Sequence, residues 1–165
     1  MRKAVATVLC GAFATNVVAL TPNDAVQVVA GLVSGVIGTN VETQITTCIQ
    51  NAPTLVTEVE TAVADFQKGS FDGILSGFEE IATIIQQIPS DLSTCEAIEA
   101  DLPKILAFAA QFADVPTLIE HLTENLLTHF SEIKGDVQTA LTDFSQADYF
   151  DFGDEIGTAL ETAVE

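Results

Sequence analysis

Basic residues are scarce in this sequence. Lys and Arg together number five among 165 residues, against 24 Asp and Glu, so the formal net charge is −19. Two of the five, Arg2 and Lys3, stand at the N-terminus, and none occurs between Ala4 and Gln67. A surface this acidic repels phosphate backbones and anionic lipid headgroups. We therefore expect neither nucleic acid nor an anionic membrane surface among its partners.

Motifs for catalysis and metal binding are absent as well. The chain has no Gly-x-Ser-x-Gly elbow, no His-Glu-x-x-His zinc site, no paired Glu-x-x-His and no phosphate-binding glycine loop. Its two histidines, His121 and His129, flank Asn125 on one expected helix. With Glu124 or Glu132 this row could hold a metal ion, but we favour solvated polar residues beside a leucine stripe. We predict that the protein is not an enzyme and has no catalytic residue, cofactor or metal ligand.

Apolar residues, by contrast, are abundant. They make up 48% of the chain and charged residues only 18%, which distinguishes this sequence from intrinsically disordered acidic proteins. A chain of this length has enough apolar material for the core of one domain. We predict a single acidic domain over residues 20–165.

The N-terminal segment has the features of a signal peptide. Two basic residues precede an apolar stretch over residues 4–14, and small residues follow. Cleavage fits after Ala14 or after Ala19, and we favour Ala19, which makes residues 1–19 the signal peptide. An uncleaved anchor helix is the alternative, although residues 4–20 are a marginal length for spanning a bilayer.

Cleavage there leaves two cysteines, Cys48 and Cys95. An even number of cysteines in an exported protein is typical of a disulfide. This one would close a loop of about 46 residues and stabilise the fold by about 4 kcal/mol. Two buried free thiols are the alternative.

Helical periodicity fills the rest of the chain. Apolar residues recur every three or four positions, most clearly from Leu118 to Phe144, and no segment alternates with the period of a strand. Proline and glycine mark the ends: we expect helix stops at Gly38 and Pro89 and an interruption at Gly135. Further helices are expected over 41–68, 91–112 and from about residue 148 onward. The predicted fold is all-α, a compact antiparallel bundle of six or seven helices with proline kinks at Pro53 and Pro103.

The most unusual stretch is ADYFDFGDEIGTAL, residues 147–160. As an EF-hand loop it fails, because the third, fifth and twelfth positions would be Phe150, Phe152 and Ala159, which offer no side-chain oxygen. As a helix start it succeeds, with Asp148 or Asp151 as the cap and aromatic side chains in the corner. The residues that we expect to pack this corner are Tyr149, Phe150, Phe152, Gly153 and Gly157.

Four segments carry a resemblance to a known group of proteins. They are TPNDAVQVVAGLVSGVIG (21–38), IIQQIPSDLSTC (84–95), LLTHFSEIKGDV (126–137) and ADYFDFGDEIGTAL (147–160). Together they resemble small exported helical proteins of ciliated protists, over nearly the whole mature chain and including the two cysteines. The resemblance implies an extracellular or endomembrane helical protein with one disulfide, and it adds no active site.

Two functions without catalysis fit these observations. The first is a secreted structural or interaction protein of the cell surface or extracellular space. It could form homo-oligomers once divalent cations bind diffusely to its carboxylates or low pH protonates them. The alternative is a carrier that encloses an apolar small molecule or lipid within the bundle.

Overall fold

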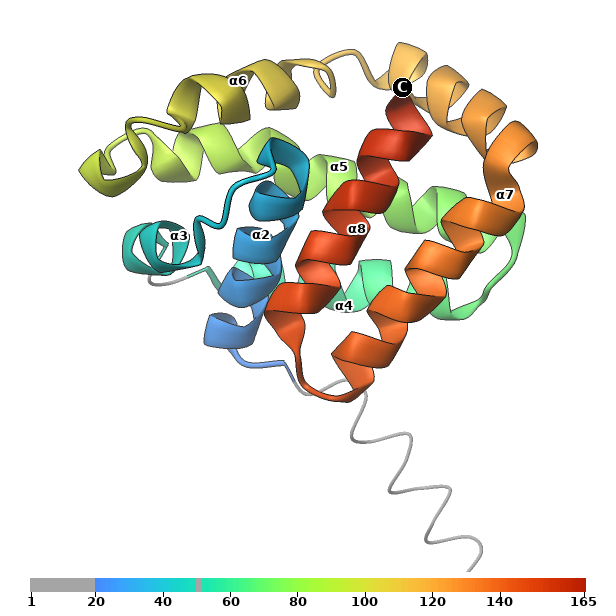
Figure 1. Ribbon diagram of the computed structural model, residues 1–165, viewed down its shortest axis with the longest axis horizontal. Coiled ribbons are helices and arrows are strands. Elements are labelled where there is room, and N and C mark those ends of the chain that lie inside the picture. The colour runs from blue at the N-terminus through green and yellow to red at the C-terminus, as the bar shows by residue number, and fades with distance from the viewer. Residues whose placement is uncertain (1–19, 50–51) are drawn as a thin grey trace, which may run out of the picture.

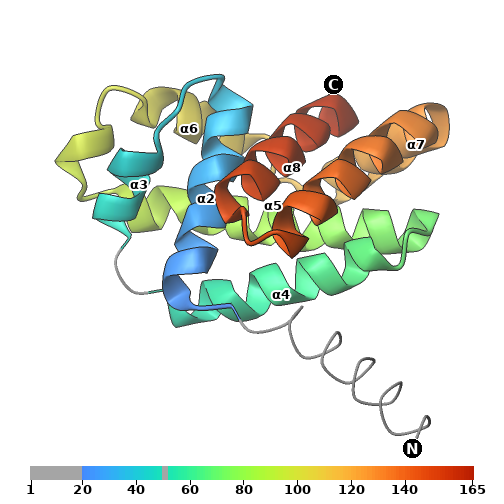
Figure 2. The same cartoon turned by 60° about the horizontal axis from the view of Figure 1, so that its bottom comes forward.

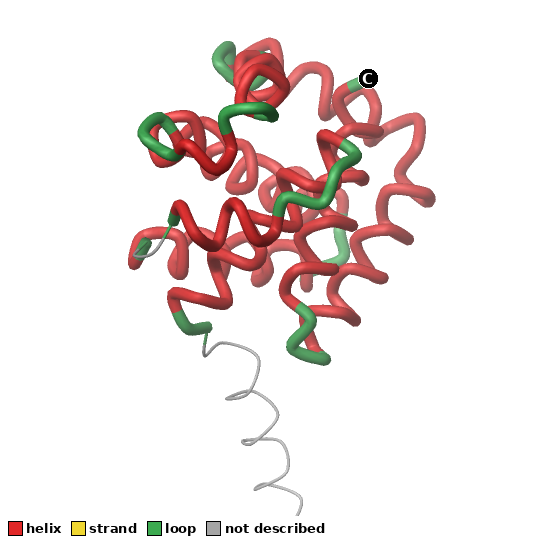
Figure 3. The backbone as a smooth tube through the Cα atoms, turned by 60° about the vertical axis from the view of Figure 1, so that its left-hand side comes forward, coloured by secondary structure: helices red, strands yellow, loops and turns green. Residues whose placement is uncertain are grey.

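The computed structural model describes residues 20–49 and 52–165, so the expected signal peptide over 1–19 lies outside the described residues. The described chain is an all-α bundle of seven α-helices and one short 3₁₀ helix, with no strand in these two ranges (Figures 1 and 3). The all-α expectation is therefore confirmed. The elements in chain order are α2 (Pro22–Ile37), α3 (Glu42–Cys48), α4 (Pro53–Gln67), α5 (Phe71–Leu92), η1 (Glu96–Ile98), α6 (Leu102–Ala110), α7 (Val115–Ser145) and α8 (Tyr149–Val164).

Helix α2 begins and ends at the residues that the sequence indicates. The backbone N–H of Thr21 donates to Oδ2 of Asp24 at 2.8 Å, and the N–H of Asp24 donates to Oγ1 of Thr21 at 3.2 Å. This capping box satisfies two backbone donors that have no partner within the helix. At the other end Gly38 has φ 66°, the left-handed conformation that closes a helix.

The prolines act differently from the prediction. Pro53 is the first residue of α4 and Pro103 the second residue of α6, so neither is a kink within a helix. The first turn accepts proline because backbone N–H groups have no intrahelical acceptor there. Pro89, expected as a stop, lies inside α5. The helix continues past it because Ile88 and Leu92 are buried, which offsets the lost hydrogen bond.

The break in α7 also lies elsewhere than predicted. Gly135, where we expected an interruption, lies within the helix. The non-helical residue is His129, with φ −116° and ψ 22°, so α7 bends there without proline or glycine. Helices α6 and α7 meet at 84°. Among the described residues, no single helix is long and apolar enough to span a membrane; by length and composition, only the bent pair of α6 and α7 taken together would be.

The helices form two layers (Figures 1 and 2). Helix α8 lies between α2 and α7, and α4 and α5 lie side by side across this group. α4 with α5, and α7 with α8, are consecutive helices that turn back on each other, as expected for an antiparallel bundle. Helix α6 packs on α5 and α2 at the opposite end of the molecule from the α7–α8 corner.

The closest helix pair, α2 with α8, runs in parallel rather than antiparallel. A Cβ atom on Gly153 would lie 2.1 Å from the carbonyl oxygen of Val28, and one on Gly157 would lie 2.5 Å from that of Leu32. Because the contacts advance in the same direction along both helices, α2 and α8 point the same way (Figure 1). Glycine is required on α2 as well, since a Cβ on Gly31 would lie 1.9 Å from the carbonyl oxygen of Phe150.

Candidate functional site

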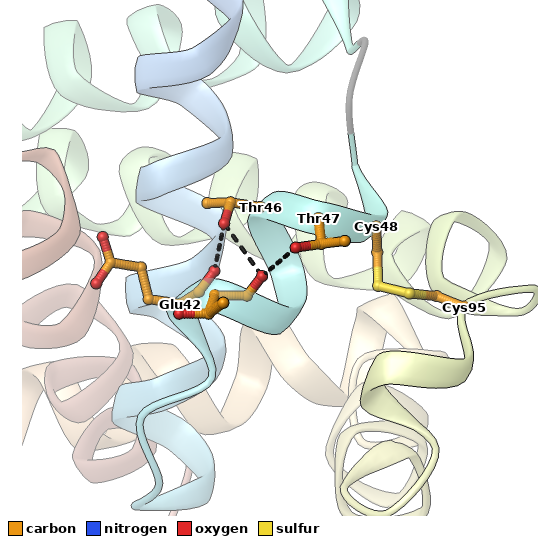
Figure 4. The surroundings of a disulfide bond; sticks show 6 residues. Glu42, Thr46, Thr47, Cys48 and Cys95 are labelled. Carbon is orange, nitrogen blue, oxygen red and sulfur yellow. Dashed lines mark hydrogen bonds between the residues drawn. A yellow bond between two sulfur atoms is a disulfide. The ribbon is translucent and has the colours of Figure 1, made fainter.

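The disulfide predicted between Cys48 and Cys95 is confirmed. Their Cα atoms are 5.6 Å apart, within the usual range for such a bond. It ties the C-terminal end of α3 to the residue before η1 (Figure 4). Helix α3 has only seven residues, too few to be stable alone, so this covalent link holds it against the bundle.

In the α7–α8 corner the rings of Tyr149 and Phe152 lie against the ring of Phe144. The ring of Phe144, near the end of α7, lies 5.3 Å from that of Tyr149 and 5.1 Å from that of Phe152, both edge-on. Phe152 is fully buried and Phe150 is half-buried. The side chain of Asp148 caps α8 by accepting from the N–H of Asp151 at 3.5 Å. The corner thus fixes where α8 starts, and Gly153 and Gly157 then bring α8 onto α2.

Carboxylates crowd around the same corner. We call the following side chains the acidic α7–α8 face: Glu132, Asp136 and Asp143 from α7 and Asp148, Asp151, Asp154 and Glu155 from α8 and its cap. Burial, followed by repulsion from Asp148 and Asp143, raises the pKa of Asp151. Burial, followed by repulsion from Asp136, raises the pKa of Glu155. The neutral, protonated forms of these groups are therefore favoured relative to free carboxyl groups.

The same direction holds elsewhere in the described chain. Burial raises the pKa of Asp91, as it does that of Asp154 within the acidic α7–α8 face. Burial and then the neighbouring carboxylates Asp65 and Glu58 raise the pKa of Glu80, on the seam between α4 and α5. Glu58 itself accepts a hydrogen bond at 2.7 Å from Nε2 of Gln87 through one oxygen, while its other oxygen is buried.

Few positive charges are available to offset this repulsion. The described ranges contain three lysines. Lys68 forms an ion pair with Asp65, and Nζ of Lys104 lies 3.8 Å from Oδ1 of Asp101. Lys134 lies over the ring of Phe130 at 5.7 Å. Within the described chain, the contact of a basic side chain with the acidic α7–α8 face is that of Nδ1 of His129 with Glu132, at 3.6 Å, and it is an ion pair only when the histidine is protonated.

The histidine row does not assemble a metal centre in the described residues. No group of three or more His, Cys, Asp or Glu side chains there is placed to hold a metal ion. His121 and His129 are both exposed, and the amide of Asn125 instead donates to the carbonyl oxygen of Ala163 at 3.0 Å. Asn125 therefore joins α7 to the last turn of α8.

The carrier hypothesis needs an enclosed cavity, and the apolar pocket nearest to that description is small. It lies between α2, α5 and α6, is lined by side chains such as Leu32, Ile85 and Phe108, and has a volume of about 10 Å³. This is about the space of one water molecule, whereas ligand pockets have on the order of 300 Å³ or more. Two larger hollows, of about 440 and 400 Å³, are open surface grooves.

Sequence reasoning missed the glycines of α2. Gly31 and Gly35 have the same spacing of four as Gly153 and Gly157, and the two pairs face each other. Glycines at this spacing line up on one side of a helix and allow another backbone to approach. The Gly-x-x-x-Gly pattern in both segments was the available signal.

An exported, disulfide-bonded, all-helical protein is the class that these features define. The chain belongs to the SctB-like family, described as secreted protein B-like, whose model matches residues 12–162. The family's description refers to secretion and names neither an enzymatic activity nor ciliated protists. No curated protein and no solved structure matches the chain.

Proposed function

We propose that the protein is a non-catalytic structural or interaction protein of the cell surface or extracellular space, and that it associates with itself when its carboxylates are protonated or bound by divalent cations. Membership of a secreted family and the disulfide support export. The observation that carries the self-association is the raised pKa of several carboxyl groups, which cluster with few cations among them.

The physical reason is the balance between repulsion and apolar contact. Two copies that each carry a net charge of −19 repel each other at neutral pH. Protonation of carboxyl groups removes part of this charge, and divalent cations that bind diffusely between neighbouring carboxylates screen it. Apolar contacts between copies are then no longer outweighed, so the oligomer forms as conditions become acidic or rich in calcium.

Light scattering tests this proposal on protein that has been secreted by an expression host and purified. We expect the mass of a monomer at about pH 7 without calcium, and at least a doubling at about pH 4 or on addition of calcium at pH 7. Sodium chloride at matched ionic strength separates calcium binding from simple screening. A monomeric mass under all of these conditions would refute the proposal.

A further inference from the structure

Helix α6 has an apolar face on its outer side. Pro103, Leu106, Ala107 and Ala110 are exposed, and their spacing of three and four places them along one stripe of the helix. We call these four residues the outer α6 face. Leu106 is 45% exposed, which is unusual for a large aliphatic side chain in this chain. The inner side of α6 is occupied by Ile105 and Ala109, which are buried.

The outer α6 face is also free of charge, unlike the surfaces around it. Residues 105–113 include no charged residue, and Gln111 is the only residue with a polar side chain among them. Beside the face lies a groove of about 400 Å³ between α5 and α6, lined by Gln86, Pro89, Leu106, Ala109, Ala110 and Ala113. A charge-free apolar stripe next to an open groove, on a strongly acidic molecule, is the surface expected of a contact site.

The charges at the two ends of this face complement each other. Lys104 stands at the start of α6, where it forms an exposed pair with Asp101 at 3.8 Å, and the exposed Asp114 stands just beyond the end of α6. If two copies of α6 pack antiparallel about a twofold axis, Lys104 of each copy comes beside Asp114 of the other. The midpoint of this pairing falls next to Ala110, a small residue that allows the helices to approach closely. In this arrangement Lys104 exchanges its weak, exposed pair with Asp101 for Asp114 of the other copy, which makes the face complementary to itself, as a twofold interface requires.

We propose that the outer α6 face is the twofold interface through which two copies of this chain associate, with Leu106 of each copy entering the groove of the other. The inference rests on the self-association proposed above and assigns it a surface. The position of α6 supports the assignment, because this helix lies at the opposite end of the molecule from the corner of the acidic α7–α8 face (Figure 1). A dimer through α6 thus keeps these carboxylates far apart.

A matched pair of charge substitutions tests the interface. Leu106→Glu places a carboxylate in the proposed contact, and Leu127→Glu adds the same charge at a leucine that is 72% exposed on α7 and has Glu124 beside it on the helix. At pH 7 with calcium, where the introduced Glu is ionised and the wild type is expected to dimerise, we expect Leu106→Glu to weaken the dimer at least about tenfold by sedimentation equilibrium and Leu127→Glu to have little effect. Circular dichroism melting checks that both variants remain folded.

Cross-linking tests the geometry separately. A short bismaleimide should join two copies of the Ala110→Cys variant, since this position lies close to the twofold axis. It should not join copies of Thr139→Cys, at an exposed position on α7, and the wild type without added cysteine gives the background. Failure of Ala110→Cys to cross-link under conditions where the protein is dimeric would overturn the proposed pairing.

The outcomes separate the two proposals. If the wild type dimerises and Leu106→Glu dimerises equally well, this interface is overturned and the proposed self-association remains intact. A wild type that is monomeric under every condition overturns both. Binding of the monomer to phosphatidylcholine vesicles, lost in Leu106→Glu, would assign the face to lipid and also overturn the twofold interface.

Discussion

The contact between α2 and α8 makes Gly153 the position where one added methyl group should cost most. A Cβ there would lie 2.1 Å from the carbonyl oxygen of Val28 and 2.8 Å from the amide nitrogen of Leu32. Carbon and oxygen atoms normally approach to about 3.3 Å, so the helices must separate by about 1 Å. Both contacting atoms belong to backbone, and no change of rotamer can relieve the overlap.

The cost follows from this geometry. Overpacking costs about 1–3 kcal/mol. A gap of about 0.5–1 Å between the helices removes about a quarter to a half of the attractive energy of each van der Waals contact across it. We take the upper end, about 3 kcal/mol, for the overpacking and subtract the gain of about 0.5–1 kcal/mol that alanine brings to a helix interior, so Gly153→Ala should cost about 2–2.5 kcal/mol. For a protein of this size the melting temperature should fall by about 4–10 °C.

Gly135→Ala is the matched control. Gly135 lies within α7, and a Cβ added there would meet no atom within 4 Å. Alanine should therefore only raise helix propensity and stabilise the protein by about 0.5–1 kcal/mol. Urea unfolding followed by circular dichroism, with the disulfide intact, measures both. If Gly153→Ala is as stable as Gly135→Ala, the close backbone contact between α2 and α8 does not exist.

Three further predictions concern other parts of the fold. Ala147 has φ 62°, a left-handed conformation that costs about 1 kcal/mol for a residue with a side chain. Ala147→Gly should therefore raise the free energy of unfolding by about 1 kcal/mol in urea titrations. A loss of stability would contradict the assigned conformation. Replacing both Cys48 and Cys95 by serine should cost about 4 kcal/mol by the chain-entropy relation for a separation of 47 residues, and an unchanged urea midpoint would argue against the bond. Stability should rise as pH falls from neutral toward about 4, because groups such as Asp151 have a higher pKa in the folded than in the unfolded state, so the folded protein binds more protons there. The destabilisation by the ionised carboxylate is fully present above its pKa in the folded state and absent below its pKa in the unfolded state. Asp151→Asn should therefore flatten the dependence of the unfolding free energy on pH. A wild-type stability that falls continuously as the pH is lowered from about 7 to about 4 would refute the sign.

Local patterns were sufficient to predict most helices. The apolar spacing in α5 and α7 places Ile81, Ile85, Leu122 and Leu126 in the core, where they are found, because each position depends on the helix period alone. Pro89 misled the prediction because its effect depends on the burial of Leu92, which is a tertiary contact. The disulfide was predictable from the cysteine count, because the third cysteine of the sequence, Cys10, lies within the expected signal peptide.

The pairing of α2 with α8 could not be derived in this way. The glycine pairs of the two helices are widely separated in the chain, and the local sequence of neither helix indicates which other helix it packs against. The expected antiparallel order rested on consecutive helices turning back on each other, which holds for α7 with α8 but has no force for helices distant in sequence. Likewise, the bend at His129 has no proline or glycine to announce it.

Because α2 and α8 are the first and last helices of the described chain, their contact cannot form until α8 has been synthesised. Residues 38–148 lie between them, so α2 is complete while its closest partner has not yet been synthesised. At usual rates of translation this delay is on the order of ten seconds. A chain interrupted before Tyr149 leaves the glycine face of α2 uncovered, so truncation removes the closure of the bundle and not only its last helix.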